Sequence, residues 1–363
     1  MSSLDVDTLN DPELSIPITT PLTNIPQLDN KLKISQTLTG KEAEAFDPVI
    51  SFPELLLVEE RLQSTFQNAE ILIKDSCLRL LASGGKRIRP LLTLQSAQCF
   101  GPLSTATIDA AVAAELIHMA SLIHDDVIDM SDLRRGIITI NAQEGNHIAV
   151  LAGDFIFAEA FRILSQEKLL ICMSFLVEAI QAMCNGEIQQ ARERFNLNVE
   201  LADYFKRIEK KTGILLASCC CSGAASAGAT HEELDIMREY GMNLGYVYQI
   251  IDDILDFTGN TQKIGKPAAA DLLNGHITLP LIYLLNKPSY ASWVKEIIQK
   301  EHITSQDIEE IIQGLIASNA LNEAFDTALY CAEAAVAALS TLPPTPSKAF
   351  LIQLTHKVLH RRK

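Results

Sequence analysis

Proline is missing from a long central part of this sequence. None of the 14 prolines lies between Leu103 and Lys266. Because an interior proline breaks a helix, this span, which is dense in Ala, Leu, Ile, Glu and Gln, favours long helices. Alternation of β-branched and polar residues never persists beyond a few positions, which excludes an extensive sheet. The sequence therefore predicts an all-α fold, a single bundle of about ten or more mostly antiparallel helices.

Positive charge and metal-type cysteine pairs are also scarce. The 30 Lys and Arg residues against 45 Asp and Glu give a net charge of −15, which argues against a nucleic-acid partner. The eight cysteines include no Cys-x-x-Cys pair, so we interpret them as buried thiols in a reducing compartment. No basic stretch followed by an apolar one opens the sequence, as a secretory signal would. We therefore expect a cytoplasmic protein.

The uncharged stretch 212–230 is the best candidate for a membrane span. It is rich in Ala, Gly, Ser and Cys rather than in Leu or Ile. This composition favours a tightly packed helix of a soluble protein.

A flexible extension followed by one folded domain is expected. Residues 1–50 hold five of the 14 prolines and show no sustained period, so we interpret residues 1–52 as a flexible extension. An amphipathic pattern begins near Pro53, and residues 53–363 are expected to form one folded domain. Its helices should break where Gly, Asn or Pro cluster, for example at Gly101, Gly145 and Gly228.

Two Asp-Asp-x-x-Asp groups stand inside apolar stretches with helical periodicity. The first acid group is Asp125, Asp126 and Asp129, and the second acid group is Asp252, Asp253 and Asp256. Carboxylates at positions i and i+4 share one helix face and repel, so a cation is expected between them. Hard oxygen donors without a Cys or His cluster suit Mg²⁺. One such group is equally explained as a solvated helix face, whereas a second copy among Ile and Leu favours a metal site.

Basic and polar residues suited to phosphate precede these acids. In the loop that runs from Gly84 to Pro90, Lys86 and Arg89 are able to neutralise a phosphate group, and a helix is predicted to begin at Pro90. His118 lies two helical turns before Asp125 on roughly the same face. Alternatively, the loop is an ordinary basic turn, and His118 is a histidine of the core.

Both acid groups closely resemble the two aspartate-rich motifs of the trans-type isoprenyl (polyprenyl) diphosphate synthases. Further matches follow in the order of that family, over about residues 53–363. They are Gly84-Gly-Lys-Arg-Ile-Arg-Pro90, Glu115-Leu-Ile-His118, Gly153-Asp-Phe155, Gly186-Glu-Ile-Gln-Gln190, Lys211-Thr212 and Gly265-Lys-Pro267. The resemblance implies the isoprenoid synthase fold, helices around a central cavity. It also implies an enzyme that adds isopentenyl diphosphate to an allylic diphosphate with two or three Mg²⁺ ions.

The resemblance assigns roles to individual residues. All six aspartates are implied to be catalytic, with Asp125, Asp129 and Asp252 as metal ligands. The residues implied to bind isopentenyl diphosphate are Lys86, Arg89, His118 and Arg135. Those implied to bind the allylic diphosphate are Arg134, Lys211, Thr212, Gln249 and Lys266.

Two positions depart from the pattern of many relatives. Ala269 stands where they carry Gly, and His276 where they carry Lys ahead of Thr278-Leu-Pro280. We expect diphosphate binding there either to weaken or to depend on protonation of His276 near pH 6.5. Lys266 is expected to keep the main role.

Small residues precede the first acid group where short-chain members of the family carry aromatic ones. Ala120 and Ser121 leave space, and Ile117 lies one turn further back. Because one helical turn rises about 5.4 Å, close to one extended isoprene unit, bulk on this helix would limit the number of units. We predict a long all-trans product, C40–C50. The alternative is that these small residues only allow neighbouring helices to pack closely and do not set the product length.

Other functions remain open at this point. A class I terpene cyclase shares the fold and one acidic motif, but its second motif differs from Asp252-Asp253-x-x-Asp256. A medium-chain synthase of the geranylgeranyl type and a catalytically weak subunit of a heteromeric synthase are further alternatives. By resemblance we expect a homodimer, with small residues such as those near Ala217 to Ala227 in the contact. Association with a membrane surface is expected through the lipid product.

Overall fold

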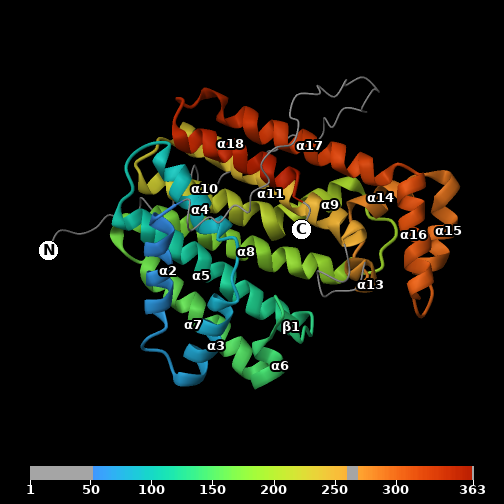
Figure 1. The fold of residues 1–363 in the computed structure, drawn as a ribbon, viewed down its shortest axis with the longest axis horizontal. Helices are drawn as coiled ribbons and strands as arrows, with labels where there is room; N and C mark the ends of the chain where they lie inside the picture. Colours follow the sequence, from blue (N-terminus) through green and yellow to red (C-terminus); the bar gives the residue numbers. More distant parts are fainter. Residues whose placement is uncertain (1–51, 260–268, 362–363) are drawn as a thin grey trace, which may run out of the picture. The chain divides into compact units, whose positions relative to one another are not determined.

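A computed structural model describes residues 52–259 and 269–361, which belong to one compact unit, Ala45–Lys363 (Figure 1). Lys266 and residues 1–51 of the predicted extension lie outside the described residues. The first half contains α2 (Glu54–Thr65), α3 (Ile71–Ala82), α4 (Ile88–Gln98), α5 (Thr105–Ile128), α6 (Ile140–Glu144), α7 (Asn146–Leu164), α8 (Leu170–Arg192), α9 (Leu201–Ile208) and α10 (Ile214–Ser226). The second half contains α11 (His231–Thr258), α13 (Ala270–Leu273), α14 (Leu279–Leu285), α15 (Pro288–Ile298), α16 (Ser305–Ala317), α17 (Ala320–Ala338) and α18 (Pro346–Leu359). The all-α prediction is confirmed.

Helices α5 and α11 carry the two acid groups near their C-terminal ends. Each begins with a capping box, in which the side chains of Ser104 and Thr230 accept a hydrogen bond from the backbone N–H three residues later. α5 packs mainly against α7 and α4, and α11 against α10 and α17. These contacts fix where the two acidic ends lie.

Helix α10 forms the middle of the core, as its small residues predict. All residues from Ile214 to Ala224 are buried, and α10 packs against α4, α8 and α11. The stretch 212–230 is therefore an internal helix. The expected dimer contact through Ala217 to Ala227 is wrong, because Ala217 and Ala224 are covered by the chain's own helices.

Among the described residues, two helical segments are long and apolar enough to cross a membrane, Thr105–Ile128 and Glu167–Arg192. Their apolar windows differ in burial. The first, α5, is 78% buried, whereas the second, which contains α8, is only 33% buried.

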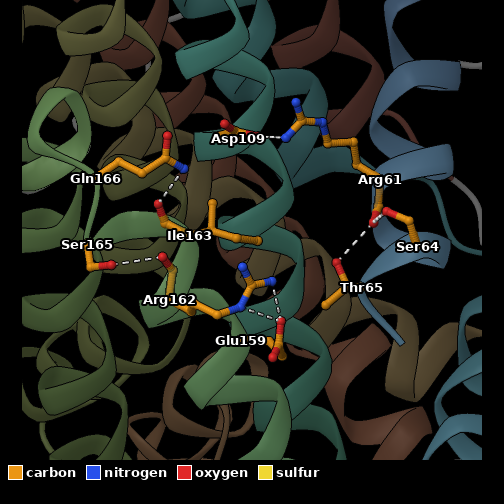
Figure 2. Close-up of polar contacts among 9 residues, drawn as sticks. All are labelled: Arg61, Ser64, Thr65, Asp109, Glu159, Arg162, Ile163, Ser165 and Gln166. Atoms are coloured by element: carbon orange, nitrogen blue, oxygen red, sulfur yellow. Dashed lines mark hydrogen bonds and ion pairs between the residues drawn. The ribbon is translucent and has the colours of Figure 1, made fainter. Parts of the chain in front are cut away.

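Helix α2 is tied to α5 by an ion pair between Arg61 and Asp109, which Figure 2 shows spanning the two helices. The pair borders a cavity of about 360 Å³ between α2, α5 and α7. The other guanidinium on its wall, that of Arg162, is held by Glu159 at 2.6 Å. Both cations are thus neutralised locally, and neither acid group lies on this cavity.

One short hairpin was not predicted. Strands β1 (Leu133–Arg134) and β2 (Ile137–Ile138) pair antiparallel, joined by Arg135 and Gly136 with φ of 51° and 79°. Two consecutive left-handed residues make a tight hairpin turn. The hairpin follows α5 directly and holds Arg134 and Arg135 beside the first acid group.

Candidate active site

A cavity of about 810 Å³ opens between α4, α5, α8 and α11, and residues of both acid groups line it. Asp125 comes from α5 and Asp252 from α11. The predicted substrate-binding residues that line the cavity are Lys86, Arg89, His118, Arg134, Arg135, Lys211, Thr212 and Gln249. Every predicted diphosphate-binding residue within the described residues therefore lines this one cavity. Its two aspartates, Asp125 and Asp252, are 127 positions apart in the chain (252 − 125).

The members of the first acid group play different structural parts. Asp125 faces the cavity, and Asp129 is the exposed C-cap residue of α5. Asp126 is buried and accepts two hydrogen bonds from Nε of Arg134, at 2.8 and 2.9 Å. Asp126 therefore orients Arg134 toward the cavity instead of facing it.

The second acid group divides in the same way. Asp252 lines the cavity and pairs with Arg361, a residue the site prediction did not include. Asp253 is buried and accepts hydrogen bonds from Tyr204 Oη at 2.7 Å and from Gln249 Nε2 at 2.9 Å. Asp256 accepts from the backbone N–H of Ala270 and Asp271, which fixes the start of α13.

Arg361 also covers Tyr248. Its guanidinium lies 4.1 Å from the centre of the Tyr248 ring and donates to the Tyr248 carbonyl oxygen at 2.9 Å. A cation already lies over this ring, as expected for an electron-rich aromatic face. The basic C-terminal end of the chain therefore reaches the second acid group.

The carboxylates of the cavity suit a divalent cation. Burial, with Glu187 nearby, raises the pKa of Asp125 to about 7, and burial raises the pKa of Asp252 against the opposing charge of Arg361. Such shifts show that burial outweighs the positive charge near these carboxylates. In the described part of the chain no three Asp, Glu, His or Cys side chains form a closed ligand set. An open set of carboxylates fits Mg²⁺, which keeps several waters and shares substrate phosphates.

Basic side chains form the opposite wall. Lys86 is exposed at the mouth, and Arg89 lies deeper, with its buried Nε unpaired. Burial, together with Arg89 and Arg135, holds the pKa of His118 well below its usual value. His118 is therefore neutral near pH 7 and is able to donate a hydrogen bond but supplies no charge. Arg135 donates to the Gly84 carbonyl oxygen, which joins the hairpin to the basic loop.

Arg87 is the residue of the basic loop that the sequence did not single out. It caps α4, which begins at Ile88, two residues before the predicted Pro90, with a left-handed φ of 46°. Its buried guanidinium binds Glu59 and Glu115, the latter at 3.3 Å, and donates to the Leu81 carbonyl oxygen at 2.9 Å. Arg87 thus points into the core while Lys86 and Arg89 face the cavity.

Replacing Arg87 and Lys86 should separate folding from binding. Arg87→Ala leaves the buried Glu115 without its ion pair, so we expect the free energy of unfolding to fall by about 3–5 kcal/mol. Lys86→Ala should leave that free energy nearly unchanged and raise the KM for isopentenyl diphosphate. Urea unfolding and steady-state kinetics of the two variants provide the comparison, and equal stability losses would contradict it.

The far wall is organised by one π-helical turn, Glu209–Gly213. Its Lys211 pairs with Glu187 at 2.6 Å and donates to Gln190 at 2.9 Å. Gly186 makes this approach possible, because a Cβ there would lie 2.9 Å from Cγ of Lys211. Thr212, the next residue, donates to Gln249 at 2.8 Å, which joins two of the predicted allylic-side residues directly.

His276 does not replace the lysine of other family members by becoming protonated near pH 6.5. Burial and the nearby Lys211 lower its pKa to about 4, and its Nε2 lies 3.2 Å from the Nε2 of Gln190, which donates to it. The expected protonation near pH 6.5 is wrong, because burial, and then the surrounding cations, disfavour a charge on His276.

The depressed pKa of His276 should appear in the pH dependence of stability. The unfolded chain binds this proton near pH 6.5 and the folded chain only near pH 4, so the contribution to stability is complete above pH 6.5 and is lost as the pH falls toward 4. In His276→Asn this part of the acid dependence should vanish. Urea unfolding across pH 4–7, with the exposed His302→Asn as control, measures it, and identical pH profiles for wild type and His276→Asn would contradict it.

The three predicted chain-length residues lie at different depths. Ser121 lines the cavity, and its hydroxyl donates to the His118 carbonyl oxygen at 2.9 Å. Ala120 and Ile117 are fully buried beside it in α5 and do not line the cavity. The apolar part of the lining includes Leu122, Phe157, Ile180, Met183 and Leu215.

A family model for polyprenyl synthetases matches residues 70–315, a range that contains both acid groups and the basic loop. The chain belongs to the polyprenyl synthetase family. A relative in Bacillus subtilis (strain 168), heptaprenyl diphosphate synthase component 2, is 36% identical over 85% of this chain and 87% of its own length. The octaprenyl diphosphate synthase of Escherichia coli (strain K12) is 34% identical over 83% and 93%.

Solved structures of the family have the same fold. The polyprenyl synthase from Caulobacter crescentus CB15, crystallised with calcium and isoprenyl diphosphate, superposes with a TM-score of 0.81. It is 33% identical, and the match covers 86% of this chain and 96% of that one. The isoprenoid synthase fold expected from the sequence is thereby confirmed.

Proposed function

We propose that this protein is a long-chain trans-prenyl diphosphate synthase, which joins isopentenyl diphosphate to an allylic diphosphate such as farnesyl or geranylgeranyl diphosphate. The observation that carries the proposal is the single cavity lined by Asp125, Asp252 and eight predicted diphosphate contacts. Carboxylates for a metal and cations for phosphate on facing walls suit chemistry in which diphosphate departs. A terpene cyclase would need no second diphosphate site, and the separate basic wall of Lys86, Arg89 and Arg135 supports a second substrate.

Mg²⁺ would be held by Asp125 and Asp252, with Asp129 at the rim, and two or three ions are proposed from the family resemblance. When bound, Mg²⁺ neutralises the diphosphate and makes it a better leaving group. The chain itself orients the reactants. Lys211, Thr212 and Arg134 would hold the allylic diphosphate, and Asp126 fixes the direction of Arg134.

Isopentenyl diphosphate would lie against the basic loop, with Lys86, Arg89 and Arg135 on its phosphates and neutral His118 donating a hydrogen bond. The carbon–oxygen bond of the allylic diphosphate would break first, with the electron pair leaving on the diphosphate. The double bond of isopentenyl diphosphate would then attack the allylic cation, and loss of a proton to the released diphosphate would leave a longer allylic chain. Apolar side chains such as Leu122 and Phe157 keep water from the cationic carbon. Asp253 and Tyr204 hold Gln249 and α11 in place.

The product is proposed to be long, several units beyond C20, with C40–C50 retained from the sequence. By its name the octaprenyl relative lies at the lower edge of that range, and the heptaprenyl relative lies one isoprene unit below it. A cytoplasmic homodimer is proposed, with residues 53–363 as the catalytic domain and residues 1–52 as an extension. Contact with membranes would arise through the lipid product.

One relative is named as a component, so the chain must be tested alone. The purified protein is incubated with Mg²⁺, labelled isopentenyl diphosphate and farnesyl diphosphate, and the dephosphorylated products are separated by chromatography. A ladder ending at C40–C50 supports the proposal. A C20 end product would establish the medium-chain alternative, and no product without a second polypeptide would establish the heteromeric one.

A further inference from the structure

Two polar side chains lie on the buried face of α9, a helix that contributes nothing to the active-site cavity. α9 (Leu201–Ile208) lies wholly within the described residues, and none of its side chains lines the cavity. It packs against α8, α11 and the π-helical turn Glu209–Gly213. Tyr204 is fully buried and Arg207 is 5% exposed. For stability alone an apolar face would serve as well, because burial of a charge is costly.

A first chain of hydrogen bonds runs from Arg207 through the end of α8 to the π turn. Nη1 of Arg207 donates at 2.9 Å to one carboxylate oxygen of Glu193, the residue that follows α8. The other oxygen of Glu193 accepts from Nε2 of Gln189 at 2.8 Å. The amide oxygen of Gln189 accepts from Nζ of Lys210 at 3.0 Å. Arg207 therefore ties the last turn of α8 to the π turn.

A second chain leads from Arg207 to the next lysine. Nη2 of Arg207 donates to the Ile277 carbonyl oxygen at 2.6 Å, which holds the backbone beside His276. Nε2 of His276 accepts from Nε2 of Gln190 at 3.2 Å. Oε1 of Gln190 accepts from Nζ of Lys211 at 2.9 Å. One guanidinium is thus connected to two successive lysines through two different segments.

A third chain begins at Tyr204 and ends at Thr212. The guanidinium of Arg207 lies 5.6 Å from the centre of the Tyr204 ring, within the range of a cation–π contact. Oη of Tyr204 donates to Asp253 at 2.7 Å, and the other oxygen of Asp253 accepts from Gln249 at 2.9 Å. Oε1 of Gln249 accepts from the Thr212 hydroxyl at 2.8 Å. The three chains therefore converge on three successive residues of the π turn.

Resting on the proposed function, we propose that Tyr204 and Arg207 are positioning residues for the allylic diphosphate, which hold Lys211 and Thr212 toward the cavity from behind its wall. π turns are rare and recur at functional sites, and this one supplies both residues to the cavity lining. A connected polar network in a buried site specifies one arrangement of its parts. None of the three chains includes the basic loop, so their loss should affect one substrate and not the other.

Tyr204→Phe removes a single hydroxyl and tests the third chain. The KM for farnesyl diphosphate should rise about three- to tenfold, the factor that corresponds to one buried hydrogen bond, while the KM for isopentenyl diphosphate stays within about twofold. The dissociation constant of unreactive farnesyl thiolodiphosphate, measured by calorimetry with Mg²⁺, should rise by the same factor as the first KM. Equal rises for both substrates, or no rise for either, overturn the proposal.

The matched control is Tyr240→Phe. Tyr240 lies on α11 and is fully buried, but its hydroxyl donates to the Leu351 carbonyl oxygen at 2.9 Å, away from the three chains. Urea unfolding should show a similar loss of stability in both variants, whereas Tyr240→Phe should change neither KM. If Tyr240→Phe raises the KM for farnesyl diphosphate as much as Tyr204→Phe does, the effect is one of general stability and the proposal is wrong.

Arg207→Lys and Arg207→Gln test the first two chains. Lysine keeps the charge beside Glu193, but one nitrogen holds Glu193 and the Ile277 carbonyl less firmly than a guanidinium fork, and glutamine loses the charge as well. The KM for farnesyl diphosphate should therefore increase from wild type to lysine to glutamine. An equal KM in all three proteins overturns the proposal. If Arg207→Gln fails to fold, Arg207→Lys and Tyr204→Phe decide the question.

A double-mutant cycle separates action through Gln249 from an independent effect. In Gln249→Ala, adding Tyr204→Phe should raise the dissociation constant of farnesyl thiolodiphosphate by less than about twofold, because the third chain is already broken. Effects that multiply in full would show that Tyr204 does not act through Gln249, against the proposal. Failure of the proposed function is distinct, because the wild-type protein would then make no polyprenyl product.

Discussion

Asp125→Ala and Asp252→Ala should each lower kcat by about 10³-fold or more while leaving the fold intact. Each removes a carboxylate that faces the shared cavity and would hold Mg²⁺, and loss of several kcal/mol of transition-state stabilisation corresponds to this factor. Asp125 is short of positive charge, since burial and Glu187 raise its pKa to about 7, so its removal should not destabilise the metal-free protein. Steady-state kinetics and urea unfolding of the purified variants measure the two effects.

The matched control is Asp235→Ala. Asp235 lies on α11, the helix that carries Asp252, but is exposed and outside the cavity. Its replacement should leave kcat within a factor of about two, because it touches no reacting group. Near-normal turnover in both Asp125→Ala and Asp252→Ala would refute a metal site shared by the two helices.

Ser121→Phe should shorten the product to about C20 or less at little cost in turnover. Ser121 lines the cavity four residues before Asp125, so a phenyl ring there would occupy the space that the third or later isoprene unit needs, since one helical turn spans about 5.4 Å. Reversed-phase chromatography of the dephosphorylated products gives the length distribution. Ser121→Ala, which adds no bulk, should leave that distribution as in the wild type.

Ala120→Phe provides the sharper comparison. Ala120 is fully buried and does not line the cavity, so a phenyl ring there must displace neighbouring helices before it reaches the product. We expect a shortened product together with a lower free energy of unfolding, by about 1–3 kcal/mol for overpacking. A product distribution unmoved in both variants would mean that the chain grows along another path.

Local patterns in the sequence account for much of what the structure shows. The proline-free span predicts the helices, and the composition of the stretch 212–230 predicts that α10 is a tightly packed helix. The two acid groups and the basic loop carry the family resemblance, and the eight substrate-binding residues that this resemblance implies within the described part of the chain all line one cavity. These features are readable because helical periodicity and motif spacing are properties of a few neighbouring residues.

The local sequence did not predict which aspartates are buried and which line the cavity. Asp126 and Asp253 look equivalent to their neighbours in sequence, yet both are buried, one holding Arg134 and the other held by Tyr204. Arg87 likewise resembles the adjacent Lys86 but points into the core toward Glu115. The local sequence does not determine which of two adjacent charged side chains will contact a residue of another helix, because that depends on how the helices pack.

By itself the sequence determined the helical fold, the two acidic helix ends and the chemistry that suits them, because these depend on residue type and spacing along the chain. The tertiary structure alone decided which carboxylates face the cavity, that Arg361 reaches Asp252, that His276 stays neutral, and that α8 leaves an apolar side open. Each of these depends on burial and on charges brought together from distant segments. A pKa or an exposed face is a property of the assembled surroundings, not of the residue that carries it.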